Sequence, residues 1–243
     1  MVTALLNLFR RPDRSANIRR IWDRARDCPV PGDPGPPDPA LNGQDDDWYL
    51  YFEVNLPAPK RYKAWLAENI RERQIIPYVL DAAYTRTGDR IRAGLEGSTH
   101  VDAMVLNRAT GAAILVEAKV LSDVSYQISF DTMRNQVARN IDVMLEANPE
   151  LMEPLCQRDP AQSRFILLTP RMFKQQPSSR LYGWLMREYC SSDRGSAALA
   201  RDLPHRHGDE LAGLPPRLGW LTWEDIEETA TGSCPWLAPR ASA

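Results

Sequence analysis

The sequence predicts an α/β protein with a mixed central sheet flanked by helices. Short apolar runs of strand length recur along the chain, and longer segments with helical spacing of apolar residues separate them. At 243 residues with 43% apolar content, the chain can bury a sizeable core. The runs that we expect to form strands are residues 101–106, 112–120, 164–169 and 218–221.

The N-terminal region divides into two parts. Residues 1–28 carry seven arginines against three aspartates, with apolar residues that suggest one or two short helices. We expect a basic helical extension there, packed and solvated by default, with a phosphate-contacting arm as the alternative. Residues 29–47 are rich in proline, glycine and aspartate and predict an irregular connection. The α/β domain then covers residues 48–243.

The most informative segment is residues 101–119, which predicts two strands joined by a tight turn at Thr110-Gly111. Asp102 interrupts the first apolar strand. Side chains alternate along a strand, so Glu117 and Lys119 share one face of the second. Because residues 112–120 are nearly continuous in apolar residues, we expect a buried central strand, where charges are costly unless they are paired or bound to a metal.

The two acids, Asp102 and Glu117, form a magnesium site if the hairpin register brings them together. Magnesium prefers oxygen ligands and is usually held by one or two carboxylates with water and substrate phosphate. We expect Asp102 and Glu117 as ligands, with the Ala118 carbonyl as a further one. Lys119 can then position a water and offset developing charge. The alternative is a solvated hairpin in which Glu117 and Lys119 form an ion pair.

A helix is expected after this hairpin. Apolar residues recur at three- and four-residue spacing and predict about five turns with one apolar stripe that packs on the sheet. Gln136 and Arg139 are three residues apart on one flank of that stripe, and we expect both to reach toward Glu117. The stripe consists of Phe130, Met133, Val137, Ile141 and Met144.

The combination of these motifs resembles the PD-(D/E)XK nuclease superfamily, over residues 60–170. Val101 stands where the name-giving proline would be. The resemblance implies a restriction-endonuclease-like fold, two metal-binding acids, a lysine that assists the nucleophilic water, and a Gln-x-x-Arg pair that supports the site or contacts phosphate. The residues that carry the resemblance are Asp102, Glu117-Ala118-Lys119 and Gln136-Val137-Ala138-Arg139.

The resemblance also implies a glutamate contributed by the first helix. Residues 62–84 have helical character, and Pro77 should kink or divide this segment. Glu68 is the candidate and Glu72 the alternative, since either can be a solvated helix charge. His100 precedes Asp102 by two residues and shares its face; it is expected to be structural or exposed, with contact to substrate or metal water as the alternative.

The C-terminal third supplies the remaining elements. Ser178 or Ser179 is expected to cap a helix that contains residues 181–189. Glycine and proline breakers predict a loop at residues 191–216, in which His205-Arg206-His207 is a poor metal site. Thr222 has capping-box spacing from Asp225, which predicts a short helix after the last strand.

Composition limits the setting of the protein. The net charge of −2 argues against a globally basic coat, although basic groups can be confined to one cleft. No apolar run approaches the ~20 residues of a membrane helix. The cysteines are far apart in sequence and indicate neither a zinc ribbon nor a disulfide framework, so a reducing cytoplasm fits. They are Cys28, Cys156, Cys190 and Cys234.

The function expected from the sequence is hydrolysis of nucleic-acid phosphodiesters with Mg²⁺, or Mn²⁺, as cofactor and with DNA preferred over RNA. The resemblance implies restriction, phage defence or repair as settings. One alternative is a catalytically silent nuclease fold that binds nucleic acid or a protein; another is a structural or assembly protein. The intact set of Asp102, Glu117 and Lys119 favours activity. A homodimer or a protein partner is compatible with the sequence.

Overall fold

The computed structural model describes residues 1–26, 38–74, 76–84, 95–125 and 130–237. A five-stranded mixed sheet in the order β1-β2-β3-β4-β5 forms its centre. The first three strands are antiparallel, and β3, β4 and β5 are parallel. The predicted α/β class is confirmed, and β3 is the central strand, as its apolar run predicts. The strands are β1 (Trp48–Leu56), β2 (Thr99–Asn107), β3 (Ala113–Ala118), β4 (Ser163–Thr169) and β5 (Leu218–Thr222).

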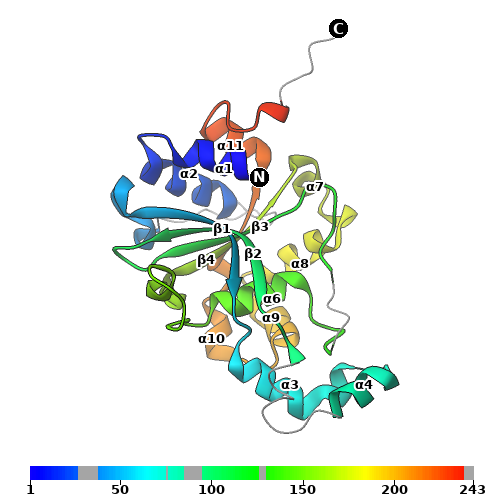
Figure 1. The fold of residues 1–243 in the computed structure, drawn as a ribbon. Coiled ribbons are helices and arrows are strands. Elements are labelled where there is room, and N and C mark those ends of the chain that lie inside the picture. The colour runs from blue at the N-terminus through cyan, green and yellow to red at the C-terminus, as the bar shows by residue number, and fades with distance from the viewer. Residues whose placement is uncertain (27–37, 75, 85–94, 126–129, 238–243) are drawn as a thin grey trace.

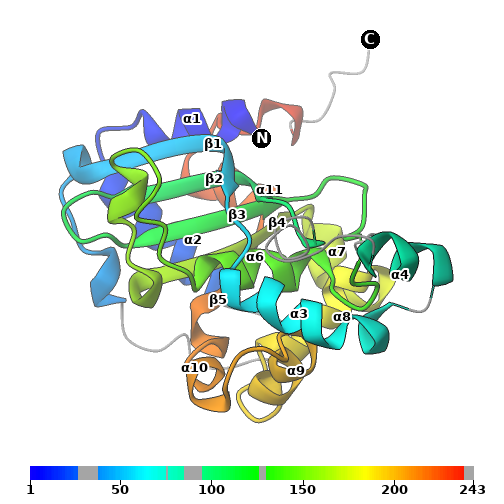
Figure 2. The ribbon, with the colours of Figure 1, turned by 60° about the horizontal axis from the view of Figure 1, so that its bottom comes forward.

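Helices cover both faces of the sheet. Figure 1 shows α1, α2 and α11 on one side and α6, α8, α9 and α10 on the other. In Figure 2, β1, β2 and β3 lie side by side, and α3 and α4 project from one end of the sheet. The α-helices are α1 (Val2–Phe9), α2 (Arg14–Arg26), α3 (Lys60–Arg73), α4 (Pro77–Tyr84), α6 (Gln136–Met144), α7 (Arg171–Gln175), α8 (Leu181–Tyr189), α9 (Gly195–Asp202), α10 (Gly208–Ala212) and α11 (Trp223–Thr229).

Short 3₁₀-helices occupy several connections. They are η1 (Pro39–Leu41), η2 (Asp45–Asp47), η3 (Leu155–Gln157), η4 (Pro160–Gln162), η5 (Pro177–Ser179), η6 (Pro215–Arg217) and η7 (Pro235–Leu237). Proline begins five of them, because its fixed φ suits the first helical position and its missing N–H would have no partner there. The described part of the expected irregular connection, residues 38–47, therefore contains η1 and η2.

The alternation of side chains divides the core between the two faces. Met104 and Leu115 pack with α6, α8 and α9, whereas Val105 and Ile114 pack with α1, α2 and α11. Trp22 of α2 is fully buried in the second of these clusters. The first 26 residues thus form two helices that cover one face of the sheet and share its core.

Several expected elements occur where the sequence predicts them. Pro77 begins α4 and separates it from α3. The Thr222 side chain accepts a hydrogen bond from the Asp225 amide, and Asp225 accepts in return from the Thr222 amide at 2.9 Å, so the capping box before α11 is confirmed. Strand β1, in contrast, is an additional element that the sequence analysis does not assign.

The helix after the hairpin is shorter than predicted. It has nine residues instead of about five turns, because Asn135 acts as its N-cap and accepts a hydrogen bond from the amide of Ala138. Phe130 and Met133 therefore precede the helix, and Met133 is exposed. The five-turn prediction is wrong because apolar spacing alone does not show where a capping side chain ends the pattern.

Two further corrections concern the C-terminal third. The predicted loop at residues 191–216 contains α9 and α10, which begin at Gly195 and Gly208. Glycine is tolerated at the start of a helix, so it does not rule one out, and Leu199 of α9 and Leu211 of α10 are buried in the core. The predicted serine cap of α8 is also wrong, since Arg180 is the N-cap residue and makes no capping hydrogen bond with its side chain.

The turn between β2 and β3 depends on Gly111. Its φ of +76° lies in the left-handed region that favours glycine. A Cβ atom at this position would lie 2.7 Å from the backbone oxygen of Gln157, and the Gly111 oxygen accepts a hydrogen bond from the Asp159 amide. The turn therefore sets the hairpin register and holds the hairpin against residues 157–159.

We predict that Gly111→Ala lowers the free energy of unfolding by about 2–4 kcal/mol, because it combines left-handed strain with a backbone clash. Gly232→Ala is the matched control, since Gly232 has φ +86° but a Cβ there would meet no atom within 4 Å. Strain alone should cost the control about 1–2 kcal/mol in urea unfolding. Equal losses in the two variants would show that the Gln157 backbone gives way without cost.

Candidate active site

The hairpin register brings Asp102 and Glu117 together at one end of the central strand. Strands β2 and β3 pair Ala103 with Val116, so Asp102 faces Glu117 one residue further along. The Asp102 Oδ2 atom accepts a hydrogen bond from the Ala118 amide at 2.7 Å. Residues directly opposite in an antiparallel pair project to the same face. Both carboxylates consequently lie on the face that α6 covers.

Lys119 completes this cluster from the next position on the same face. Its Nζ atom lies 2.7 Å from Glu117 Oε1 and donates to Gln136 Oε1 at 2.9 Å. The Lys119 amide donates to the Leu168 carbonyl of β4, which fixes the backbone beyond the end of β3. The ammonium group has three donors, so one remains for a further acceptor.

Helix α6 supplies the other partners of the Glu117 carboxylate. Gln136 Nε2 donates to Oε1 at 2.6 Å, and Asn140 Nδ2 donates to Oε2 at 3.0 Å. The residues are four apart and therefore lie on the same face of the helix. Glu117 is only 1% exposed, so these hydrogen bonds replace the water that a charged carboxylate would otherwise bind.

Burial raises the pKa of Glu117 above its ordinary value of 4.5, and the neighbouring charge of Asp102 raises it further. Lys119 and Asn140 act in the opposite direction, because both stabilise the ionised carboxylate. The pKa remains raised overall. The site therefore holds a carboxylate whose negative charge is only partly compensated by protein groups.

The donor set of this cluster fits a magnesium ion. No group of three or more His, Cys, Asp and Glu side chains in the described ranges is arranged as a metal site, but magnesium commonly uses one or two carboxylates and completes its shell with water. Asp102 and Glu117 provide two, and a cation held by them would offset the repulsion that contributes to the raised pKa of Glu117. A role for the Ala118 carbonyl stays a prediction.

Arg139 lies elsewhere than expected. Its Nε atom is 2.6 Å from Oε1 of Glu96, a buried residue shortly before β2. Gln136 contacts Glu117 and Lys119, so the two members of the Gln-x-x-Arg pair have different partners. Glu68 and Glu72 are both exposed on α3, and His100 is exposed on β2.

Two residues that contact the predicted site residues, Asn140 and Glu96, are not among those predicted from the sequence. Asn140 follows Gln136 by four residues and interrupts the apolar stripe, a signal comparable to that of Asp102 in its strand. Glu96 gives no such signal, because its partner Arg139 lies more than 40 residues further along the chain. Only the fold brings these two side chains together.

The His205-Arg206-His207 segment takes part in a buried ionic cluster. His205 Nε2 lies 3.0 Å from Asp142 Oδ1, and Arg206 Nε donates to the same oxygen at 2.5 Å. Arg134 Nη2 donates to the other oxygen of Asp142 at 2.6 Å. His207, by contrast, is exposed. These contacts give His205 and Arg206 a structural role beside α6.

Within the described ranges, three of the seven N-terminal arginines form ion pairs with carboxylates, and Arg14 instead donates to the backbone oxygens of Phe9 and Asp45. The ion pairs are Arg20 with Asp13 at 3.4 Å, Arg24 with Glu228 at 2.6 Å and Arg26 with Asp23 at 2.9 Å. Together with the burial of their helices on the sheet, these ion pairs support the packed-helix interpretation.

The remaining compositional expectations concern thiols and membranes. Cys156, Cys190 and Cys234 are free thiols, and Cys28 lies outside the described residues. No helix in the described part of the chain combines the length and the apolar character needed to cross a membrane.

Compared with models of protein families, with curated proteins and with solved structures, the chain matches none of them.

We predict that Glu117→Gln changes the pH dependence of stability. A carboxyl group whose pKa is raised in the folded state contributes stability below pH 4.5 that is lost as the pH rises through the raised pKa. The parent protein should therefore lose stability relative to Glu117→Gln as the pH rises from about 4.5, measured by urea unfolding in chelator. A stability difference that is constant, or that moves in the parent's favour, would contradict the raised pKa.

We predict that Arg139→Ala lowers the free energy of unfolding by about 3 kcal/mol, because it leaves the buried Glu96 carboxylate without its ion-pair partner. The double variant Arg139→Ala, Glu96→Gln should recover most of this loss in urea unfolding. If Arg139 also contacts phosphate, the double variant should still bind DNA more weakly than the parent. A single variant as stable as the parent would show that the ion pair contributes nothing to folding.

Proposed function

We propose that this protein is a metal-dependent nuclease that hydrolyses nucleic-acid phosphodiester bonds, with DNA preferred over RNA. The observation that carries the proposal is the meeting of Asp102, Glu117 and Lys119 at the end of the central strand. Two carboxylates and an ammonium in one largely buried cluster match the chemistry of phosphodiester hydrolysis. The same residues carry the resemblance to the PD-(D/E)XK superfamily, and the mixed sheet with helices on both faces is compatible with a restriction-endonuclease-like fold.

The ion pair between Glu117 and Lys119 by itself is also what a structural protein would contain. Asp102 distinguishes the two interpretations, because its charge raises the pKa of Glu117 and makes the ion pair less favourable. A structural pair gains nothing from such a neighbour. A metal site gains from it, since a second carboxylate adds both a ligand and negative charge.

The residues divide the chemical roles among them. Asp102 and Glu117 would hold a magnesium or manganese ion, which when bound supplies Lewis-acid polarisation of the phosphate and acidifies a coordinated water. The remaining donor of Lys119 can bind the attacking water or a phosphate oxygen. Gln136 donates to Glu117 and accepts from Lys119, so it fixes the separation of acid and ammonium. Asn140 holds the second oxygen of Glu117 in place.

The settings of restriction, phage defence and repair are implied by the resemblance. The second candidate function is binding by a catalytically silent nuclease fold. The environment of Glu117 favours it in one respect, because three side chains already donate hydrogen bonds to the Glu117 carboxylate. The presence of the full set of two acids and a lysine favours the enzyme. Cleavage assays with linear, circular and single-stranded DNA and with RNA, in magnesium, manganese and chelator, compare the two directly.

We predict that Lys119→Ala lowers the cleavage rate by roughly 10²- to 10⁴-fold, the usual contribution of a group that assists proton transfer. Metal and DNA binding should largely persist, because Lys119 is not a metal ligand. Asp102→Ala should instead weaken metal binding, since one of only two carboxylate ligands is lost. Single-turnover cleavage and calorimetric metal titration measure the two effects separately.

Arg108→Ala serves as a control, because Arg108 is an exposed residue at the opposite end of the hairpin. It should cleave at the parent's rate. If the parent is inert on every nucleic acid and binds DNA equally well in chelator, the hydrolase proposal fails and the silent binding module replaces it.

A further inference from the structure

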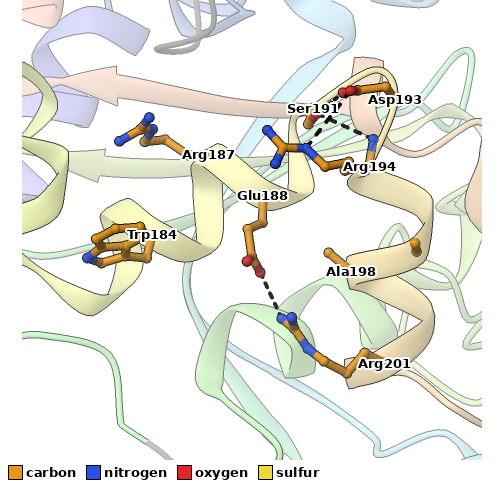
Figure 3. Close-up of a pocket in the computed structure, with 9 residues that line it drawn as sticks. Trp184, Arg187, Glu188, Ser191, Asp193, Arg194, Ala198 and Arg201 are labelled. Atoms are coloured by element: carbon orange, nitrogen blue, oxygen red, sulfur yellow. Dashed lines mark hydrogen bonds and ion pairs between the residues drawn. The ribbon is translucent and has the colours of Figure 1, made fainter.

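A cavity of about 690 Å³ lies between α8 and α9, away from the Glu117 cluster. Figure 3 shows its side chains: Trp184, Arg187 and Glu188 project from α8, Ala198 and Arg201 from α9, and Arg194 from the turn between the two helices. The cavity contains three arginines and one tryptophan, and none of these residues belongs to the candidate active site.

Trp184 is the main apolar surface of this cavity. Its side chain is 54% exposed, although tryptophan buries more apolar area than any other side chain when it is packed. The Arg187 guanidinium lies over the indole ring, 5.9 Å from its centroid, in a cation–π contact. Arg187 is exposed and forms no ion pair with any carboxylate in the described residues. An indole face beside an uncompensated cation is a platform for a flat, anionic ligand.

The other two arginines differ in their availability. Arg201 is engaged, since its Nη2 atom lies 2.9 Å from Glu188 and its Nε atom 3.0 Å from Asp202. The Glu188–Arg201 pair therefore links α8 and α9 at the cavity (Figure 3). Arg194 is 84% exposed and lies 3.9 Å from Asp193, which is 76% exposed, so solvent screens this contact strongly. Arg187 and Arg194 are thus the two cations free to bind a ligand.

We propose that this cavity binds an unpaired segment of a nucleic-acid strand, with a base stacked on Trp184 and phosphates held by Arg187 and Arg194. Stacking on an aromatic side chain beside basic residues is the common mode of single-strand binding, and duplex bases are not accessible to it. The choice of ligand rests on the proposed function. An acidic peptide would use the arginines but has no flat group to stack on the indole of Trp184.

The chain connects this cavity to the candidate active site. Asp123 accepts hydrogen bonds from the backbone amides of Leu181 at 2.7 Å and Tyr182 at 3.2 Å, in the first turn of α8. Asp123 follows Lys119 by four residues, a link that spans at most about 14 Å. Trp184 lies one turn further along α8. A single strand bound at the cavity can therefore extend to the Glu117 cluster.

The test is binding of a fluorescein-labelled oligothymidine of about 15 nucleotides to the intact protein in chelator, measured by anisotropy. Trp184→Ala should weaken binding about 5- to 150-fold, the effect of losing one stacked base. Arg187→Ala should weaken binding and reduce the salt dependence by about 0.7 in the log–log slope. Trp236→Ala is the matched control, since Trp236 is 49% exposed, lies in η7 and lines a different pocket from Trp184; it should bind like the parent.

Parent-like binding by Trp184→Ala would overturn the proposal. Displacement of the oligothymidine by polyglutamate at equal charge concentration would also overturn it, because the cavity would then be an anion site without base stacking. Equal affinity for duplex and single strand would overturn it too. The result is independent of catalysis. If binding depends on Trp184 but the protein cleaves no nucleic acid, the cavity proposal is supported and the hydrolase proposal fails. If the protein cleaves nucleic acid but binding does not depend on Trp184, the hydrolase proposal is supported and the cavity proposal fails.

Discussion

The burial of charge around α6 is the constraint on which the structure depends. The sheet-facing side of this helix donates to the buried carboxylate of Glu117 through Gln136 and Asn140. Another side presents Asp142, which is fully buried and accepts from Arg134 and Arg206. Each buried carboxylate is tolerated only because its partners are placed by the fold, and removal of one partner of such a pair typically costs 3–5 kcal/mol. The helix must therefore sit in one position.

The ends of α6 are held as firmly as its faces. Asn135 caps the first turn, and the guanidinium of Arg158 donates to the Met144 carbonyl at 2.6 Å and the Val143 carbonyl at 3.1 Å at the other end. These are carbonyls that a helix end otherwise leaves without partners. Beside the helix, the Arg134 guanidinium lies 3.5 Å from the ring centroid of Tyr62 in α3. Gln136 and Asn140 are consequently preorganised, and Glu117 needs no rearrangement to keep its hydrogen bonds.

What the sequence predicts well is what depends on local geometry. Alternation along a strand places Glu117 and Lys119 on one face, and a tight turn at Gly111 brings Asp102 beside them. Arg139 shows the limit of this reasoning: helical spacing gives its direction relative to Gln136, but its partner Glu96 comes from another part of the chain. The length of α6 differs from the prediction for a related reason: the apolar spacing reaches back to Phe130, whereas the Asn135 cap begins the helix at Gln136.

The packing of α2 against the last elements of the fold has a consequence for biosynthesis. A Cβ on Gly219 of β5 would lie 2.8 Å from Ala25 of α2, and Arg24 pairs with Asp225 and Glu228 of α11. About 200 residues separate these partners, so at 5–20 residues per second α2 leaves the ribosome roughly 10–40 seconds before β5 and α11. The face of the sheet covered by α2 is completed only after translation has passed residue 229.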